Sequence, residues 1–427
     1  MKLDVLGLLA ACSYALDCVE AELVQVTDKH AKRVAYMSVC TAQQIGIQGK
    51  ALQDLAACAL LHDNALTQYI QEELHSDPNH ASAAQDFSQL GMHCTLGEKN
   101  VRKLPFHTDI TNVILYHHEH ADGSGPFGKT WNEVPLFARI IHMCDLLDVN
   151  CRTKTFTSGT WEKAKNSLQQ TKETIIDREC AAAFFAAFSE EHFLSLGSEN
   201  LEANLWAKVP RIKQDLNFSQ IKALANFFAQ IVDYNSPFTS THSMGVAADA
   251  EKLARYIGFD EETAQKMYLA GALHDIGKVA IGNEILEKPG KLTDEEFKTM
   301  KHHAAYTYYI LSEIDDFEEI RDWAAFHHER LDGTGYPFGK TAAQLNTQER
   351  IMACVDIYQA LTESRPYKKG MPHEKACPYI VSDGHRKAVH SCGAEGWIYR
   401  MASGTNGNIG CNETIFTDGN IVIIYQH

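Results

Sequence analysis

The sequence predicts an all-α protein built from two similar helical bundles and a C-terminal tail of different character. Three observations lead to this prediction. Histidine and aspartate motifs in the first half of the 427-residue chain recur in the second half at a nearly constant distance. Apolar residues around these motifs repeat at helical spacing. From about residue 377 that spacing fades, and glycine, asparagine and β-branched residues become frequent.

The recurring motifs indicate an internal duplication. The stretch ALLHDNAL contains His62, and GALHDIGK contains His274, 212 residues later. HHEHADGSGPFGK begins at His117, and HHERLDGTGYPFGK begins at His327, 210 residues later. Chance matches of histidines would scatter, so the chain carries two copies of a unit of roughly 200 residues.

Local signals place helices in the second copy. Apolar residues recur at helical spacing between Ile221 and Val232. Gly258 can end one helix and Asp260 can cap the next. The residues TDEE at 293–296 form a capping box, which predicts the start of a further helix.

Breaks in this pattern divide the chain into three parts. Small and polar residues interrupt the helical spacing in SLGSEN, near 195–200. We therefore expect a first domain at 1–195, a second at 200–376 and an atypical tail at 377–427. The composition of the tail fits either a small β appendage or a disordered segment.

Composition indicates a cytoplasmic protein with reduced thiols. The apolar run VLGLLAACSYAL is flanked by acidic residues and is too short to span a bilayer, so a buried first helix is expected. A net charge of −16 argues against binding to a nucleic acid polymer, which requires a broad basic surface. The 12 cysteines include no CxxC pair and are expected to fill the core.

Adjacent pairs of metal-binding residue types point to a site for two ions. His274 is followed by Asp275, and His327 by His328. Neighbours on a helix point about 100° apart and cannot easily bind one ion together. They can lie between two ions instead. A bridging aspartate flanked by histidines would hold two divalent ions about 3.5 to 4 Å apart, an arrangement that activates water for phosphoryl displacement.

The motifs of the second copy resemble the HD-GYP family of metal-dependent cyclic dinucleotide phosphodiesterases. The resemblance covers about residues 230–370 and rests on HDIGK, the later HH pair, DGTGYP and DIYQALTESRPY. It implies two divalent ions, such as iron or manganese. The implied metal ligands are His242, His274, Asp275, His303, His327, His328 and Asp356.

The resemblance also implies roles for further residues. Asp275 and Lys278 would act at the scissile phosphate, and the loop residues Gly335 and Tyr336 would face the substrate. Arg365 and Lys368 would hold the other phosphate or a base. Independently of the resemblance, Lys278 lies four residues after His274, so on a continuous helix it would return to the same face.

Two positions depart from the family pattern. Phe238 stands where members that bind three ions have a glutamate, so a third ion is not expected. Gln359 replaces the aspartate that usually follows the last ligand by three residues. Neither departure removes a ligand of a two-ion site.

The first copy keeps the metal-binding residue types but lacks the groups that would contact a phosphate. Leu66 occupies the position of Lys278, the tyrosine is missing from GSGPFGK, and no RPY motif follows Asp145. We therefore expect a degenerate domain kept for structure, regulation or substrate discrimination. Its possible second metal site comprises His30, His62, Asp63, His93, His117, His118 and Asp145.

The expected function is hydrolysis of a cyclic dinucleotide to its linear form through a metal-activated water. Tandem units with a degenerate first copy resemble bacterial enzymes that degrade 3′,3′-cyclic GMP-AMP, so this substrate is favoured over cyclic di-GMP. Two alternatives remain: an HD-type phosphohydrolase acting on other nucleotides, and a non-enzymatic module that binds cyclic dinucleotides. The sequence leaves the oligomeric state open.

Overall fold

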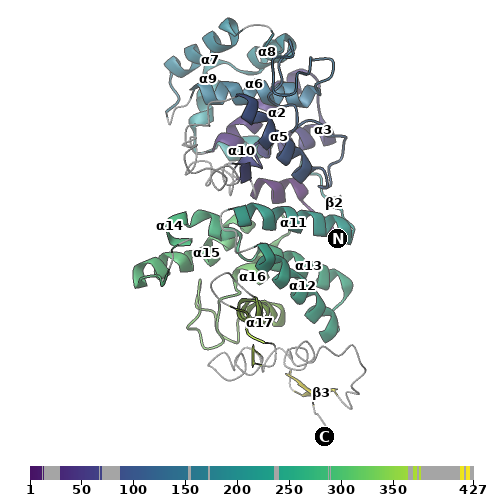
Figure 1. The fold of residues 1–427 in the computed structure, drawn as a ribbon, viewed down its shortest axis with the longest axis vertical. Coiled ribbons are helices and arrows are strands. Elements are labelled where there is room, and N and C mark those ends of the chain that lie inside the picture. The colour runs from purple at the N-terminus through teal and green to yellow at the C-terminus, as the bar shows by residue number, and fades with distance from the viewer. Residues whose placement is uncertain are drawn as a thin grey trace. The chain divides into compact units, whose positions relative to one another are not determined.

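The chain forms two compact helical units, Lys2–Leu216 and Asn217–His427 (Figure 1). The protein is represented by a computed structural model, and each unit is described by itself. The described residues are 1–11, 13, 29–66, 68–69, 87–151, 155–171, 174–234, 240–286, 288, 290–363, 369–372, 375–376, 414–417 and 420–423.

Helix α2 (His30–Gln44) is the centre of the N-terminal unit. Of its 15 residues, 13 are buried. It packs against α3, α6, α8 and α10, so it has neighbours on several faces. Further elements of this unit are β1 (Lys2–Leu3), α3 (Gly49–Leu60), α5 (Phe87–Val101), α6 (Leu136–Cys151), α7 (Ser158–Gln170), α8 (Arg178–Ala187), α9 (Glu190–Leu194), η2 (Ser195–Gly197), α10 (Leu201–Lys208) and β2 (Gln214–Asp215).

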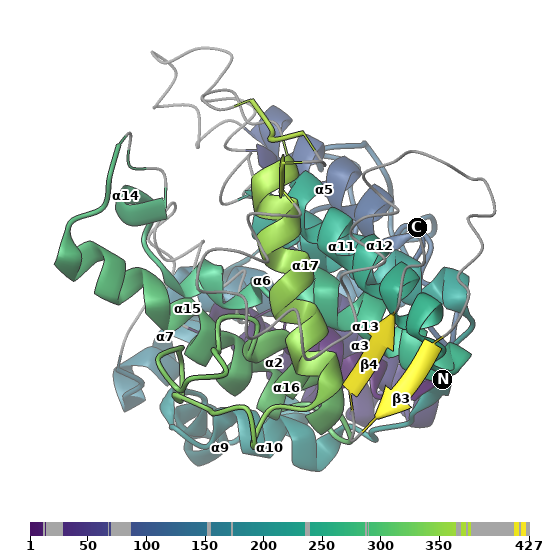
Figure 2. The same ribbon diagram turned by 90° about the horizontal axis from the view of Figure 1, so that it is seen from below.

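Helix α13 (Glu261–Leu273) takes the central place in the C-terminal unit. It packs against α11, α12 and α16, and α17 packs against α12 and α16 (Figure 2). The remaining elements are α11 (Phe218–Tyr234), α12 (Ser240–Ile257), η3 (Ile276–Ala280), α14 (Asn283–Leu286), α15 (Asp294–Ser312), α16 (Glu318–Ala325), α17 (Thr347–Thr362), β3 (Thr414–Thr417) and β4 (Asn420–Ile423).

The helix ends follow the signals in the sequence. Helix α12 stops before Gly258, whose φ of 96° lies in the region that favours glycine. The Asp260 carboxylate accepts a hydrogen bond from the backbone N–H of Thr263 and caps α13. Thr293 and Glu296 form the reciprocal capping box of α15.

The N-terminal unit continues beyond the predicted boundary near 195–200. Helix α10 packs against α2, and β2 pairs antiparallel with β1 at the start of the chain. The division between the units consequently falls after Leu216. The small and polar residues at 195–200 mark the short connection between α9 and α10, whereas the end of the unit depends on packing between residues far apart in the sequence.

The two ends of the chain are described in part. Residues 5–11 and Ser13 are helical and buried, as expected, and the other residues of that apolar run lie outside the described residues. In the tail, β3 and β4 form an antiparallel pair. Within the described part of the chain, no helix combines the length and apolar character required to cross a membrane.

Candidate metal centre

The ends of two helices position the adjacent ligand pairs of the C-terminal unit. Helix α13 ends at Leu273, directly before His274 and Asp275, and α16 ends at Ala325, shortly before His327 and His328. The backbone leaves the α-helical course at both places, so neighbouring side chains can turn toward a common centre. Helices α12, α15 and α17 contribute His242, His303 and Asp356.

Three of the histidines are oriented by the same hydrogen bond. Nδ1 of His274 lies 2.7 Å from the carbonyl oxygen of Gly271, and Nδ1 of His327 lies 2.7 Å from that of Ala324. His303 makes the equivalent contact three residues back along α15, at 2.6 Å. A carbonyl oxygen can only accept, so Nδ1 carries the proton in each ring. The Nε2 lone pairs are therefore available to a metal ion.

One group of ligand atoms lies around Asp356 Oδ1 and Asp275 Oδ2. The Nε2 atom of His242 lies 3.1 Å from Asp356 Oδ1. His274 Nε2 lies 3.7 Å from the same oxygen and 3.2 Å from Asp275 Oδ2. These four residues offer two imidazole nitrogens and two carboxylate oxygens to a common point.

A second group lies on the other side of Asp275. The Nε2 atom of His303 is 3.4 Å from Asp275 Oδ1 and 3.4 Å from His327 Nε2. His328 Nδ1 faces the second oxygen of Asp356 at 3.9 Å. The two oxygens of Asp275 therefore face different histidines, as expected of a carboxylate that bridges two ions.

The spacing and burial of these atoms fit divalent metal ions. Ligands bound at about 2.0 to 2.2 Å lie about 3.0 to 3.5 Å apart around one ion, which is close to the separations found here. His274 Nε2 is buried and makes no hydrogen bond with any described atom. A buried nitrogen without a partner is costly, and a bound ion would satisfy it.

The charge states of Asp275, Asp356 and His303 favour the same ions. Burial alone would raise the pKa of the Asp275 carboxyl, but His274 and Lys278 outweigh it and lower the pKa well below its ordinary value. The pKa of Asp356 is also lowered, because its facing histidines outweigh burial. Burial lowers the pKa of His303 to about 4, so this imidazole is neutral at pH 7.

Lys278 reaches the centre by a route that differs from the predicted one. The residues after Asp275 form a 3-10 helix, η3, so Lys278 does not return on the next turn of α13. Its Nζ atom instead donates to Asp275 Oδ2 at 2.5 Å. Gly277 permits this turn to press on α15, since a Cβ there would lie 2.0 Å from the carbonyl oxygen of His303.

The DGTGYP loop places Tyr336 beside the ligands. The Tyr336 ring centroid lies 4.7 Å from that of His328, and its backbone N–H donates to the carbonyl oxygen of His328. Lys301 Nζ lies 5.5 Å from the centre of the same ring. Lys301 is therefore a further cation near the centre, which the sequence comparison of the two copies did not single out.

The same loop is held by a buried glutamate. Glu329 accepts the backbone N–H of Phe338 at 2.7 Å and that of Lys340 at 2.9 Å. Gly335 packs directly on this segment, because a Cβ there would lie 2.3 Å from the backbone nitrogen of Arg330. Close backbone approach thus gives Gly335 a packing role, whether or not it also contacts a ligand.

Three residues discussed from the sequence, Phe238, Arg365 and Lys368, lie outside the described residues. Gln359 is described, and its side-chain amide donates to Asp249 rather than supporting a metal ligand. The described part of the centre therefore comprises the seven expected ligands together with Lys278, Gly335 and Tyr336.

The N-terminal unit repeats the arrangement of histidines around two aspartates. His62 Nε2 lies 3.4 Å from Asp63 Oδ2, and His93 Nε2 lies 3.3 Å from Asp63 Oδ1. His30 Nε2 is 3.4 Å from Asp145 Oδ1. His117 and His118 lie 3.6 Å from Asp63 Oδ1 and 3.9 Å from Asp145 Oδ2, respectively. All seven predicted residues of this set are thus brought together.

The groups that distinguish the two units lie around this shared frame. The backbone N–H of Leu66 donates to the carbonyl oxygen of Asp63 at 2.9 Å, as that of Lys278 does to Asp275. The turn is retained, but an apolar side chain replaces the ammonium group. Glu119 holds the GSGPFGK loop through Phe127 and Lys129, so the loop persists without its tyrosine.

Two residues near the N-terminal ligands were missed by sequence reasoning. The Sγ atom of Cys94 lies 3.6 Å from His93 Nε2. Burial would raise the pKa of this thiol, but His117 and His93 outweigh it and lower the pKa to about 7. Asp148 accepts from Nδ1 of His30 at 2.7 Å. The position of Asp148, three residues after Asp145, could have identified it from the sequence.

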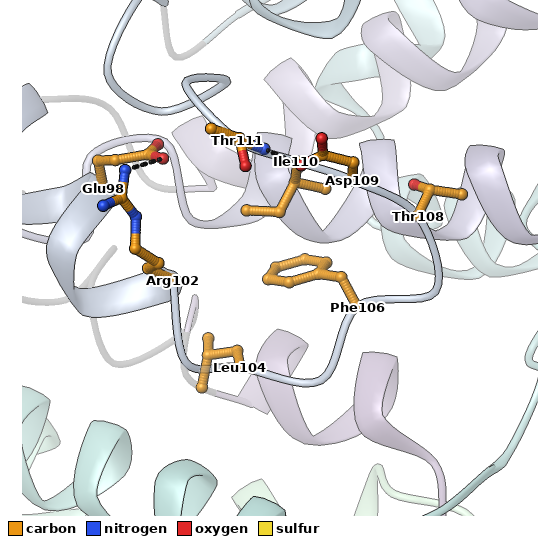
Figure 3. Close-up of a pocket in the computed structure, with 8 residues that line it drawn as sticks. All are labelled: Glu98, Arg102, Leu104, Phe106, Thr108, Asp109, Ile110 and Thr111. Atoms are coloured by element: carbon orange, nitrogen blue, oxygen red, sulfur yellow. Dashed lines mark hydrogen bonds and ion pairs between the residues drawn. The ribbon is translucent and has the colours of Figure 1, made fainter.

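A small cavity of about 160 Å³ lies elsewhere in the N-terminal unit (Figure 3). Glu98 lines it, but its carboxylate already accepts the backbone N–H groups of Asn112 and Leu115. Arg102 lies 3.7 Å from the same carboxylate. The charged groups of this cavity are therefore engaged with one another and with the backbone.

Comparison with known proteins agrees with the internal duplication. The HD domain family matches this sequence twice, over residues 18–180 and 226–387. The chain belongs to the HD domain family. Each match contains one complete set of histidine and aspartate ligands, so both HD units carry the residues that define the centre described above.

Several characterised proteins are similar to this HD protein. The 3′3′-cGAMP-specific phosphodiesterase 1 of Vibrio cholerae is 29% identical over 392 residues, which cover 86% of this chain and 87% of the relative. The 3′3′-cGAMP-specific phosphodiesterase 3 of the same organism is 30% identical over 302 residues, 70% of this chain and 65% of the relative. A cyclic di-GMP phosphodiesterase of Pseudomonas aeruginosa is 42% identical over 134 residues, 31% and 32% of the two chains.

A solved structure supports the fold. The crystal structure of a cyclic GMP-AMP specific phosphodiesterase of Vibrio cholerae matches with a TM-score of 0.63 and 23% identity. The match covers 94% of this chain and 98% of the other. At this identity the likeness establishes the tandem all-α architecture of the HD units.

Proposed function

We propose that this chain is a metal-dependent phosphodiesterase that hydrolyses a cyclic dinucleotide to the linear dinucleotide. The catalytic domain in this proposal lies in the C-terminal unit, which begins at Asn217, and 3′,3′-cyclic GMP-AMP is preferred over cyclic di-GMP. The relatives named above as phosphodiesterases for these two compounds support the substrate class.

The observation that carries the proposal is the position of Asp275 between two groups of histidines. Its two oxygens face His274 and His303 at 3.2 and 3.4 Å, and Lys278 donates to the same carboxylate. A binuclear centre beside a fixed cation suits displacement at phosphorus, where negative charge develops on several oxygens at once.

The ligands would form two sets, one for each ion. His242, His274, Asp275 and Asp356 would hold one ion, and Asp275, His303, His327 and His328 the other. Two ions bound there would supply Lewis-acid activation of water and stabilise charge on the phosphoryl oxygens.

Lys278 and Tyr336 would orient the phosphate. The Lys278 side chain is 22% exposed, so its ammonium group can turn from Asp275 toward a phosphate oxygen. Tyr336 lies beside His328 and can contact the substrate from the loop. In the reaction, the oxygen of water bonds to phosphorus and the bond between phosphorus and one ribose oxygen breaks. That ribose oxygen gains the proton that water loses.

The N-terminal unit has a different part in the proposal. It has Leu66 in place of Lys278 and no tyrosine in its loop, so it lacks two of the groups that would orient a phosphate. We propose that it regulates the C-terminal unit or contributes to the choice of substrate. The preference for 3′,3′-cyclic GMP-AMP rests on the tandem relatives and not on a residue that contacts adenine.

Product analysis with both substrates tests the proposal. The metal-loaded protein is incubated with 3′,3′-cyclic GMP-AMP and cyclic di-GMP in parallel, and the products are separated chromatographically. We expect linear dinucleotides, with faster turnover of the mixed substrate, and none from Asp275→Ala. Hydrolysis of mononucleotides alone would favour the other phosphohydrolase function, and tight binding without hydrolysis would favour a regulatory module.

A further inference from the structure

Helix α5 carries a thiol directly beside the ligand histidines of the N-terminal unit. Cys94 follows His93 and is fully buried. Its Sγ atom lies 3.6 Å from His93 Nε2 and 3.7 Å from His117 Nδ1. One ligand atom from each of His93, Cys94, His117 and His118 lies within 4.8 Å of the others.

The thiol is a difference between the two units. In the C-terminal unit, the residue that follows the matching histidine, His303, is Ala304, which is equally buried. Alanine therefore fills this position of the helix adequately, and core packing alone does not require sulfur. The N-terminal unit adds a soft ligand to a frame that otherwise has the same imidazoles and carboxylates.

Neighbouring polar atoms also lack the partners that burial demands. His117 Nε2 and Asp63 Oδ1 are buried, and neither makes a hydrogen bond within the described part of the chain. His93 Nε2 lies 3.3 Å from the same carboxylate oxygen. Because Nδ1 of His117 lies 2.6 Å from the carbonyl oxygen of Ile114, Nε2 is the nitrogen left for a ligand. These orphaned atoms indicate a cation between them.

We propose that the N-terminal unit binds a zinc-class divalent ion with the Cys94 thiolate as a ligand. His93 would be the second ligand. Adjacent side chains on a helix usually diverge by about 100°, but the long imidazole of His93 brings its Nε2 atom to 3.6 Å from Cys94 Sγ, so both can reach one ion. The other ligands would come from His117, His118 and Asp63. A zinc–sulfur bond of about 2.3 Å and a zinc–nitrogen bond of about 2.0 Å place tetrahedral ligands about 3.6 Å apart, which matches the Cys94–His93 separation.

The two units would then differ in metal preference. A thiolate is softer than imidazole or carboxylate and favours zinc, whereas the ligand set of the C-terminal unit also suits iron and manganese. The N-terminal ion would be a structural or regulatory ion rather than part of the hydrolytic centre. This inference does not depend on the proposed hydrolysis.

Cobalt substitution tests the thiolate ligand without any assay of activity. The full-length protein is loaded with Co²⁺, and its near-ultraviolet spectrum is recorded for a thiolate-to-cobalt charge-transfer band. We expect the band in the unaltered protein and its loss in Cys94→Ala. Zinc affinity at this site should fall at least about 100-fold, because loss of a supporting residue alone costs about 10- to 100-fold.

Matched variants assign the band to this site. Cys180→Ala removes a buried cysteine of the same unit, in α8, and should leave the spectrum unchanged. His93→Ala should remove the band while Cys94 is still present. The absence of a band in cobalt-loaded unaltered protein would overturn the proposal even if Cys94→Ala failed to fold. Persistence of the band in folded Cys94→Ala would assign it to another cysteine and would also overturn it.

Discussion

Replacement of Glu329 by glutamine should loosen the DGTGYP loop and slow hydrolysis. The carboxylate accepts the backbone N–H groups of Phe338 and Lys340, one at each oxygen. An amide keeps one acceptor and turns a donor toward the other N–H. The loss of one charge-assisted bond should lower the free energy of unfolding of the C-terminal unit by about 1.5 to 3 kcal/mol.

This loss translates into measurable changes. For a unit of about 200 residues it corresponds to a fall in melting temperature of about 3 to 12 °C, measured by calorimetry. Because the loop also positions Tyr336, kcat/KM for the cyclic dinucleotide should fall about 10- to 100-fold well below the melting transition. Bound metal should be unchanged, since Glu329 is not a ligand in our assignment.

The chain contains its own control for this prediction. Glu119 holds the corresponding loop of the N-terminal unit through the backbone N–H groups of Phe127 and Lys129, at 2.6 and 2.5 Å. Glu119→Gln should cost similar stability but leave hydrolysis near its original rate. Full kcat/KM in Glu329→Gln, or an equal loss of activity in Glu119→Gln, would contradict the proposed role of Glu329.

Further predictions concern the two centres. Asp275→Ala should abolish hydrolysis and reduce bound metal, and full activity would exclude the binuclear assignment. Lys278→Ala should retain the metal but slow turnover on the order of 100-fold, as expected for one contact to the transition state; an unchanged rate would make it a surface lysine. The double replacement of His62 and Asp63 by alanine should leave the C-terminal ions bound. Metal per chain and hydrolysis of both cyclic dinucleotides are measured in this variant, and loss of hydrolysis with the C-terminal ions still bound would show that the first unit takes a direct part in catalysis.

Much of the candidate metal centre could be predicted from the sequence, because the duplication shows the same pattern of residues twice. A lone histidine carries little information, whereas seven ligand types in one order, twice, define a site. The helix-ending Gly258 and the capping Thr293 were also predictable, since each acts through neighbours in the sequence. Both effects are local or repeated, and neither requires knowledge of tertiary packing.

Other features depend on contacts that no local pattern reports. The path of Lys278 follows from the close approach of Gly277 to α15, which converts the expected α-helical turn into a 3-10 helix. From the sequence, Cys94 was interpreted as a residue that fills the core. Its contact with His117 could not be predicted, because His117 comes from a distant segment of the chain. The extension of the first unit to Leu216 likewise depends on packing of α10 against α2.

The hydrogen bond that orients His30 favours the proposed binding of an ion in the N-terminal centre. In that unit Asp148 accepts from His30 and is paired with Arg33, whose Nε lies 2.6 Å from Asp148 Oδ1, and all three are buried. The corresponding C-terminal positions are Gly245 and Gln359. Taking an arginine and a carboxylate out of water is expensive, and the pair is weak evidence for stability by itself. Its geometric effect is to fix the His30 ring with Nε2 toward Asp145, as a metal ligand requires. The unit that lacks the phosphate-orienting groups therefore has the more elaborate support for a ligand, which fits metal binding in its own right better than a scaffold with residual histidines.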